Sequence, residues 1–67
     1  MRYLVNIDNY DEIDMIGYED DEGVVYLRYM PADKIEDKFD PQEYNFDYYI
    51  TLGYKEISEE DFFTELL

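Results

Sequence analysis

The first residues of the chain are rich in strand-forming side chains, and apolar residues occupy every second position from Tyr3. Residues 2–7, RYLVNI, predict a first strand in which Tyr3, Val5 and Ile7 share one face. The following residues, DNYDE, begin with aspartate and asparagine, which are common turn formers. A strand that ends in an acidic turn is therefore expected at the start of the chain.

Residues 12–19 and 24–30 predict a second and a third strand that pair as a β-hairpin. The stretch between them is acidic and ends at Gly23, which can adopt the positive φ of a tight turn. Gly17 interrupts the second strand, where a glycine often marks a β-bulge. We therefore expect a hairpin with a bulge at Gly17.

Strict alternation assigns the side chains of the second strand to two faces. Ile13 and Met15 are expected on one face, with Asp14 and Ile16 on the other.

Residues 31–39, PADKIEDKF, predict a short helix. Ile35 and Phe39 lie four residues apart, and Pro31 suits the first turn of a helix. Pro41 prevents this helix from extending further. Such a short segment needs tertiary packing to persist.

Residues 44–57 have the strongest strand pattern in the chain. Phe46, Tyr48 and Ile50 alternate with residues that would face the opposite side. Gly53 is expected to kink or bulge this strand.

The last ten residues predict a short amphipathic helix. Ser58 is a good N-cap, and it combines with Asp61 in an approximate capping box. The apolar stripe of this helix consists of Phe62, Phe63, Leu66 and Leu67. The whole pattern predicts one α+β domain over residues 1–67, with an antiparallel sheet of about four strands, a short inserted helix and a short C-terminal helix.

Net charge is more informative about function than any sequence motif in this chain. The chain of 67 residues carries 19 acidic and 5 basic residues, a formal net charge of −14. A typical small domain has a net charge of magnitude about 2–8. Disordered acidic chains are poor in aromatic residues, whereas this chain is 46% hydrophobic and 19% aromatic. It is therefore expected to fold against its own repulsion, which a positively charged partner would relieve.

Several kinds of chemistry are excluded or disfavoured by the residues that are missing. The chain has no cysteine and no histidine, so disulfides and classical zinc sites are excluded. Its single serine, Ser58, already suits a capping role, and there is no Gly-rich phosphate loop. We therefore expect a protein that is not an enzyme and needs no cofactor.

Ion binding and location can be judged from the same residues. Residues 19–23, EDDEG, lack the spacing of a calcium loop. For the looser cluster of Asp8, Asp11, Glu12 and Asp14, a solvated acidic turn is the preferred interpretation over a weak divalent-ion site. The chain has no apolar stretch long enough to span a membrane, and its N-terminal apolar run is too short for a signal peptide. With cysteine absent as well, a cytoplasmic location is expected.

Two functions from different classes fit this composition. In the first, the protein is a nucleic-acid mimic whose carboxylates occupy the basic site of a nucleic-acid-binding enzyme and inhibit it; direct binding to nucleic acid is opposed by repulsion. In composition alone the chain resembles small acidic anti-defence proteins of phages, and immunity proteins against toxin nucleases belong to the same physical class. In the second, it is an assembly module that homodimerises through an apolar helix or a sheet edge, and the acids only confer solubility.

Acidic and tyrosine side chains are the candidates for contacts with a basic partner, because carboxylates accept hydrogen bonds from arginine and tyrosine rings stack on guanidinium groups. Four consecutive acids, residues 19–22, project at the expected hairpin tip. The predicted partner-binding residues are Asp11, Asp14, Tyr18, Glu19, Asp20, Asp21, Glu22, Asp47 and Tyr49.

The tyrosines are expected to divide between the core and the outer face of the sheet. Tyr3, Tyr29 and Tyr48 are assigned to the core. Tyr26 and Tyr49 are expected on the outer face, near acids.

Overall fold

The computed structural model describes residues 1–30 and 38–67, and these residues form an α+β fold. The five strands of the single antiparallel sheet are β1 (Arg2–Ile7), β2 (Ile13–Glu19), β3 (Val25–Tyr29), β4 (Asp40–Pro41) and β5 (Lys55–Ile57). The helices are α1 (Phe46–Thr51) and α2 (Glu59–Leu66). The predicted class and the C-terminal helix are thus confirmed. The helix predicted from residue 31 falls mostly on residues outside the described ranges.

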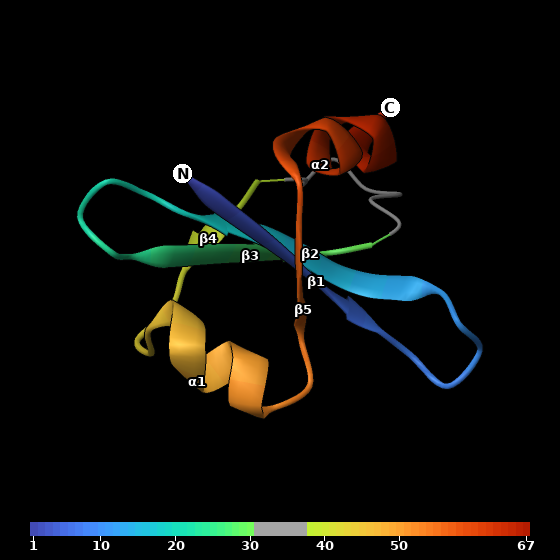
Figure 1. The fold of residues 1–67 in the computed structure, drawn as a ribbon, viewed down its shortest axis with the longest axis horizontal. Helices are drawn as coiled ribbons and strands as arrows, with labels where there is room; N and C mark the ends of the chain where they lie inside the picture. Colours follow the sequence, from blue (N-terminus) through green and yellow to red (C-terminus); the bar gives the residue numbers. More distant parts are fainter. Residues whose placement is uncertain (31–37) are drawn as a thin grey trace.

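The sheet lies between the two helices, with α2 on one face and α1 on the other (Figure 1). The strand order is β4-β3-β2-β1-β5, so β2 is the central strand and the short β4 and β5 form the edges. Edge strands this short offer little unpaired backbone to another chain.

Both faces of the sheet are buried, because each face packs on its own helix. The α1-side core consists of Leu4, Val25, Leu27, Phe46 and Tyr49. The α2-side core consists of Tyr3, Val5, Ile16 and Phe62. Strand β1 contributes to both cores: Leu4 faces α1, and Tyr3 and Val5 face α2. This explains why three successive residues of β1 are apolar, whereas a strand with one exposed face alternates apolar and polar residues.

The bulge in β2 lies at Asp14 and not at Gly17, so the predicted position is wrong. Asn6 of β1 is paired with Met15, but the next residue, Ile7, is paired with Ile13, which leaves Asp14 as the extra residue. Beyond the bulge the alternation reverses. Ile13 therefore packs against the α2-side core together with Ile16, and Met15 packs against the α1-side core.

Gly17 is required by a close approach of backbone instead. It pairs in regular register with Leu4 on one side and Leu27 on the other. A Cβ at this position would lie 2.0 Å from the Tyr26 carbonyl oxygen and 2.5 Å from Leu27 Cδ2. Because real Cβ atoms do not approach this closely, only glycine fits in the middle of this sheet.

The long strand predicted over residues 44–57 is wrong, since most of it is the helix α1. Asn45 caps the helix: its side chain accepts a hydrogen bond from the Tyr48 amide at 2.9 Å. Phe46 and Tyr49, three residues apart, point into the α1-side core. Of the predicted strand, only residues 55–57 pair in the sheet, as β5.

A Schellman motif ends α1 where the sequence suggested a kinked strand. Gly53 has φ of 108°, and its amide donates to the Ile50 carbonyl at 3.0 Å. The Tyr54 amide donates to the Tyr49 carbonyl at 3.0 Å, and the two rings pack with centroids 5.3 Å apart. These are the two hydrogen bonds and the apolar contact of this helix ending.

The capping of α2 is confirmed, because the Ser58 Oγ accepts a hydrogen bond from the Asp61 amide at 3.0 Å. Its apolar stripe is only partly buried. Phe62 is in the α2-side core and Leu66 packs against it, whereas Phe63 and Leu67 are exposed.

Candidate interaction surface

Of the four consecutive acids, Glu19 is the half-buried last residue of β2, and the turn between β2 and β3 carries the other three, one of which builds the turn itself. The Asp20 Oδ1 accepts hydrogen bonds from the amides of Glu22 and Val24, both at 2.9 Å. Gly23 has φ of 86° and closes the turn. The turn therefore needs Asp20, whereas the carboxylates of Asp21 and Glu22 point into solvent with no structural role shown.

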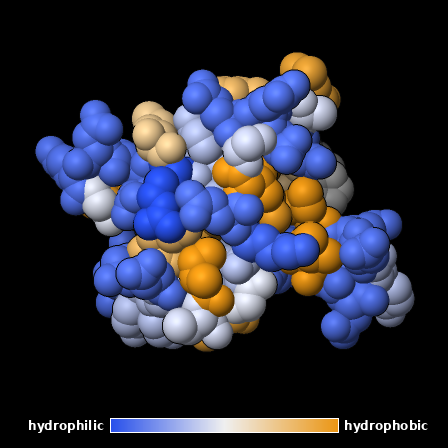
Figure 2. Space-filling view, in the orientation of Figure 1, coloured by the Kyte–Doolittle hydropathy of each residue, from blue (hydrophilic) through white to orange (hydrophobic). Residues whose placement is uncertain are grey.

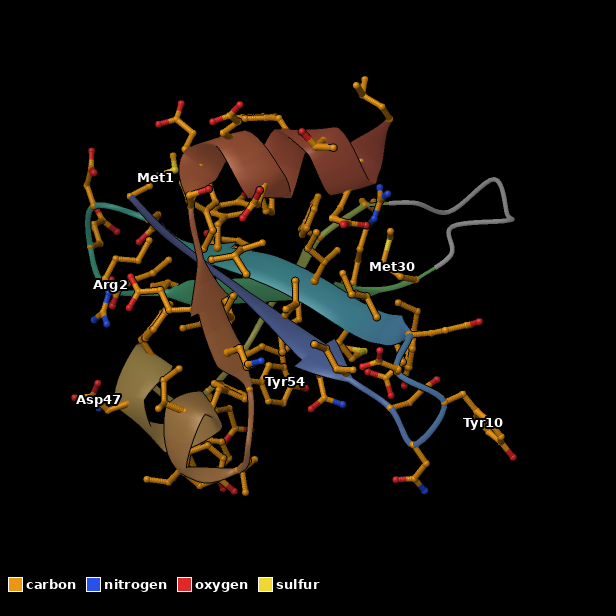
Figure 3. All side chains as sticks on the ribbon, turned by 45° about the vertical axis from the view of Figure 1, so that its right-hand side comes forward. Met1, Arg2, Tyr10, Met30, Asp47 and Tyr54 are labelled. Atoms are coloured by element: carbon orange, nitrogen blue, oxygen red, sulfur yellow. The ribbon has the colours of Figure 1, made fainter. Side chains whose placement is uncertain are left out.

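The turn between β1 and β2 is a second acidic projection. The Asp8 Oδ1 accepts hydrogen bonds from the amides of Tyr10 and Glu12, at 2.8 and 3.0 Å. The Tyr10 side chain is 84% exposed and points away from the body of the protein (Figure 3). Asp11 and Glu12 are exposed beside it. The seven residues of β2 separate the two acidic turns by about 20 Å.

The remaining predicted partner-binding residues do not form one surface. Asp14 is partly buried and accepts a hydrogen bond from Asn6 Nδ2 at 2.8 Å. Tyr18 packs against the α2-side core and stacks on Tyr26 with ring centroids 5.1 Å apart. Asp47 is exposed on α1, on the same side of the molecule as Arg2 (Figure 3).

The exposed position expected for Tyr49 is wrong, because this side chain is buried in the α1-side core. Burial raises its pKa, and burial also raises the pKa of Tyr54, which packs against the same core. Tyr26 is half-buried, and burial together with the Asp20 carboxylate raises its pKa. These three hydroxyls therefore stay neutral at physiological pH.

The assignment of tyrosines to the core is confirmed for Tyr3 and wrong for two others. Tyr3 is 8% exposed. Tyr29 is 78% exposed at the last residue of β3. Tyr48 is 39% exposed, because the helix turns it away from the face that a strand would have buried.

A tyrosine pair at α1 was missed by the sequence analysis. The rings of Tyr44 and Tyr48 are stacked, with centroids 4.1 Å apart and an interplanar angle of 22°. Their spacing of four residues, with the capping residue Asn45 between them, is the sequence signal that could have revealed the pair.

Arg2 shows how this protein binds a guanidinium group. Its Nε and Nη2 donate to the two carboxylate oxygens of Glu56, at 3.1 and 2.9 Å. The guanidinium carbon also lies 3.8 Å from the centroid of the Phe46 ring. The hydrogen bond from Arg2 lowers the pKa of Glu56, and the same bond raises the pKa of Arg2.

Most of the described carboxylates have no cationic partner. Within residues 1–30 and 38–67, the one ion pair between two described residues joins Arg2 and Glu56. No charged residue of these ranges is buried. Figure 2 shows hydrophilic residues projecting at both ends of the sheet and over α2, with hydrophobic atoms exposed between them. The negative charge thus forms several projections on a compact body.

Apolar side chains line a hollow of about 300 Å³ on the α2 side. Its lining residues are Met1, Tyr3, Tyr18, Phe39, Phe62, Phe63 and Leu66.

Comparison with known proteins gives no match: no family model, no curated protein and no solved structure is similar to the chain. In the described part of the chain, no three acids lie close enough together to hold a metal ion. None of the described helices has the length and apolar character needed to cross a membrane.

Proposed function

We propose that this protein is an acidic inhibitor that occupies the basic site of a nucleic-acid-binding enzyme, as a mimic of nucleic acid. The observation that supports this most is the set of exposed, unpaired carboxylates held on a folded body with a net charge of −14. Such a charge destabilises a compact monomer. Docking on a cationic surface offsets that repulsion, so the high negative charge favours binding to a basic partner.

The two acidic turns suit a groove that accommodates a duplex. They lie about 20 Å apart along β2, and a DNA duplex of that length carries roughly 12 phosphate charges. Arginine residues of the partner can form bidentate hydrogen bonds with carboxylates as they do with phosphates. Long-range attraction would also accelerate association, by as much as about 10–10³-fold.

The targets that fit this proposal are nucleases, restriction enzymes, CRISPR effectors, glycosylases and polymerases. The role would be that of a phage anti-defence protein or of an immunity protein against a toxin nuclease. A cytoplasmic setting agrees with the absence of cysteine and with where such enzymes act.

Capture followed by competition tests the proposal. The immobilised protein is incubated with bacterial lysate at 50 mM NaCl, and captured proteins are eluted with salt and identified by mass spectrometry. We expect a nucleic-acid-binding enzyme that a duplex oligonucleotide displaces and whose activity the protein inhibits. Capture that duplex DNA does not compete, or no salt-dependent capture at all, would rule the proposal out.

A variant of the hairpin tip then locates the contact on the captured enzyme. Neutralising the tip with Glu19→Gln, Asp20→Asn, Asp21→Asn and Glu22→Gln should slow association at least tenfold at low salt, because steering weakens. Asparagine at position 20 keeps the oxygen that accepts the two turn hydrogen bonds. Association rates are measured by surface plasmon resonance.

An equal change of net charge elsewhere is the matched control. It combines Asp40→Asn, Glu59→Gln, Glu60→Gln and Glu65→Gln, all at exposed positions. If this control slows association as much as the tip variant, net charge matters and the tip is not the contact.

The exposure of Phe63 and Leu67 beside the apolar hollow favours a second candidate, a homodimerising assembly module. Light scattering after size exclusion separates the two functions. A dimer that persists in both low and high salt, with Phe63→Ser converting it to a monomer, would support the second candidate.

A further inference from the structure

The stacked pair Tyr44–Tyr48 forms an exposed aromatic surface at α1 that lies outside both cores and contacts the α1-side core at Tyr49. Tyr44 is 52% exposed and Tyr48 is 39% exposed. The pair is held in place, because Asn45 caps the helix at the Tyr48 amide and the rings of Tyr48 and buried Tyr49 pack at 90° with centroids 5.3 Å apart. A rigid aromatic surface of this kind loses little conformational entropy when a partner binds.

The segment that carries this surface contains acids and no base, and the one described cation shown to interact with it is Arg2, through Phe46 and Asp47. Between Lys38 and Lys55 there is no basic residue, while Glu43 and Asp47 are exposed immediately before Tyr44 and Tyr48. Negative side chains next to aromatic rings attract a group that is both cationic and able to stack. This charge complementarity selects a cationic occupant.

The chain itself contains such an arrangement on the same helix. Phe46 of α1 has the Arg2 guanidinium over its ring, and that guanidinium is held at the same time by the Glu56 carboxylate. An aromatic ring combined with a nearby carboxylate is thus a geometry in which this fold already holds an arginine.

We propose that the Tyr44–Tyr48 pair, with Glu43 and Asp47, is a docking site for an arginine side chain on the surface of the partner protein. This inference rests on the proposed function and identifies one of the contacts that the basic partner makes. The guanidinium stacks on the exposed tyrosine and donates hydrogen bonds to a flanking carboxylate. Arginine and tyrosine are the residue types that most often dominate the binding energy of interfaces.

Arginine fits this surface better than the other cationic or stacking groups. A lysine ammonium is compact and strongly hydrated, so it gains less from a ring face and cannot form a bidentate pair. Nucleobases also stack on tyrosine, but the accompanying phosphates would be repelled by Glu43 and Asp47.

Two peptides of equal charge test the docking site directly. Hexa-arginine and hexa-lysine are titrated into the isotopically labelled protein at low salt, and binding is followed by NMR. We expect hexa-arginine to bind about two- to fivefold more tightly, the gain of one exposed cation–π contact. Its largest shifts should fall on residues 43–48.

The double variant Tyr44→Leu/Tyr48→Leu should abolish this preference and leave the binding of hexa-lysine nearly unchanged. Tyr10→Leu is the matched control, since Tyr10 is also exposed next to acids but is unstacked. It should retain the preference. If the double variant does not fold, as judged by its thermal melt, Tyr44→Leu alone is used, because Tyr44 precedes the helix.

The proposal is overturned if the two peptides bind equally, if neither binds, or if the double variant keeps the preference. Binding of a thymidine hexanucleotide at residues 43–48 would overturn it as well, since the occupant would then be nucleic acid. If the peptide experiment fails but the protein still captures an enzyme that duplex DNA displaces, the arginine docking site is overturned and the proposed inhibitory function stands.

Discussion

Phe62 and Phe63 are neighbours in the sequence with opposite environments. Phe62 is 3% exposed and packs on Tyr3 with ring centroids 4.5 Å apart, in the middle of the α2-side core. Phe63 is 52% exposed, because one residue turns the helix by about 100° away from the sheet. Substitutions at Phe62 and Phe63 therefore compare the same side chain in a buried and in an exposed position of one helix.

Replacing Phe62 with alanine should lower the free energy of unfolding by about 3–5 kcal/mol, which is close to unfolding a domain this small. Replacing Phe63 with alanine should lower it by less than about 1 kcal/mol. Urea denaturation followed by circular dichroism measures both values. Similar values for the two variants would contradict the orientation of α2.

Gly17 and Gly23 likewise differ in burial, since Gly17 is buried and Gly23 is exposed. Alanine at Gly17 forces its Cβ against the Tyr26 carbonyl, so we expect a loss of about 1–3 kcal/mol or more. Alanine at Gly23 meets no atom within 4 Å, and only the positive φ opposes it, at about 1–2 kcal/mol. Chemical denaturation compares the two, and a smaller loss at Gly17 than at Gly23 would be inconsistent with the observed sheet register.

At the scale of elements, local pattern predicted the strands β1, β2 and β3 and the helix α2 but failed at α1. The failure has a specific cause. Phe46, Tyr48 and Ile50 happen to alternate, and tyrosine is common in strands, so the period of two outweighed the helix signals. Those signals were present, in Asn45 as an N-cap and Gly53 as a helix ending.

Replacing Asn45 with alanine tests the helical assignment of residues 46–51. The loss of the cap should destabilise the protein by about 0.5–2 kcal/mol, whereas Asn45→Ser should be nearly neutral because serine also caps. Thermal melts of the two variants give the difference. In a strand, neither replacement would remove a capping bond, so equal stabilities would count against α1.

The bulge at Asp14 shows a different limit of local pattern. Its position follows from the pairing of Ile13 with Ile7, and this pairing places Ile13 against the α2-side core. A glycine in a strand is a weak marker of a bulge, because glycine is also required where a neighbouring strand approaches closely, as at Gly17.

On the scale of the whole molecule, charge dominates. The Cα extents are 28 × 25 × 22 Å, so at about 0.01 M salt, where the Debye length is about 30 Å, every charge acts on every other. At about 1 M salt that length falls to about 3 Å, and only adjacent groups interact.

Sodium chloride should therefore stabilise the protein. If screening relieves about 1 kcal/mol, the melting temperature rises by roughly 4–8 °C between 0.01 and 1 M. The neutralised hairpin-tip variant should melt higher at low salt and gain less from salt. Differential scanning calorimetry in potassium chloride as well as sodium chloride controls for specific ion effects. A melting temperature that falls with salt would show that repulsion is not a major destabilising term.

The sequence by itself determined the α+β class, the hairpin, the capped C-terminal helix and the excess of negative charge. These follow from composition, alternation and capping, which act between residues close together in the chain. Only the tertiary structure decided that α1 is a helix, that both faces of the sheet are covered, and that Tyr49 is buried while Tyr44 and Tyr48 are exposed. Those outcomes depend on which apolar surface each segment meets, and that surface comes from residues far away in sequence.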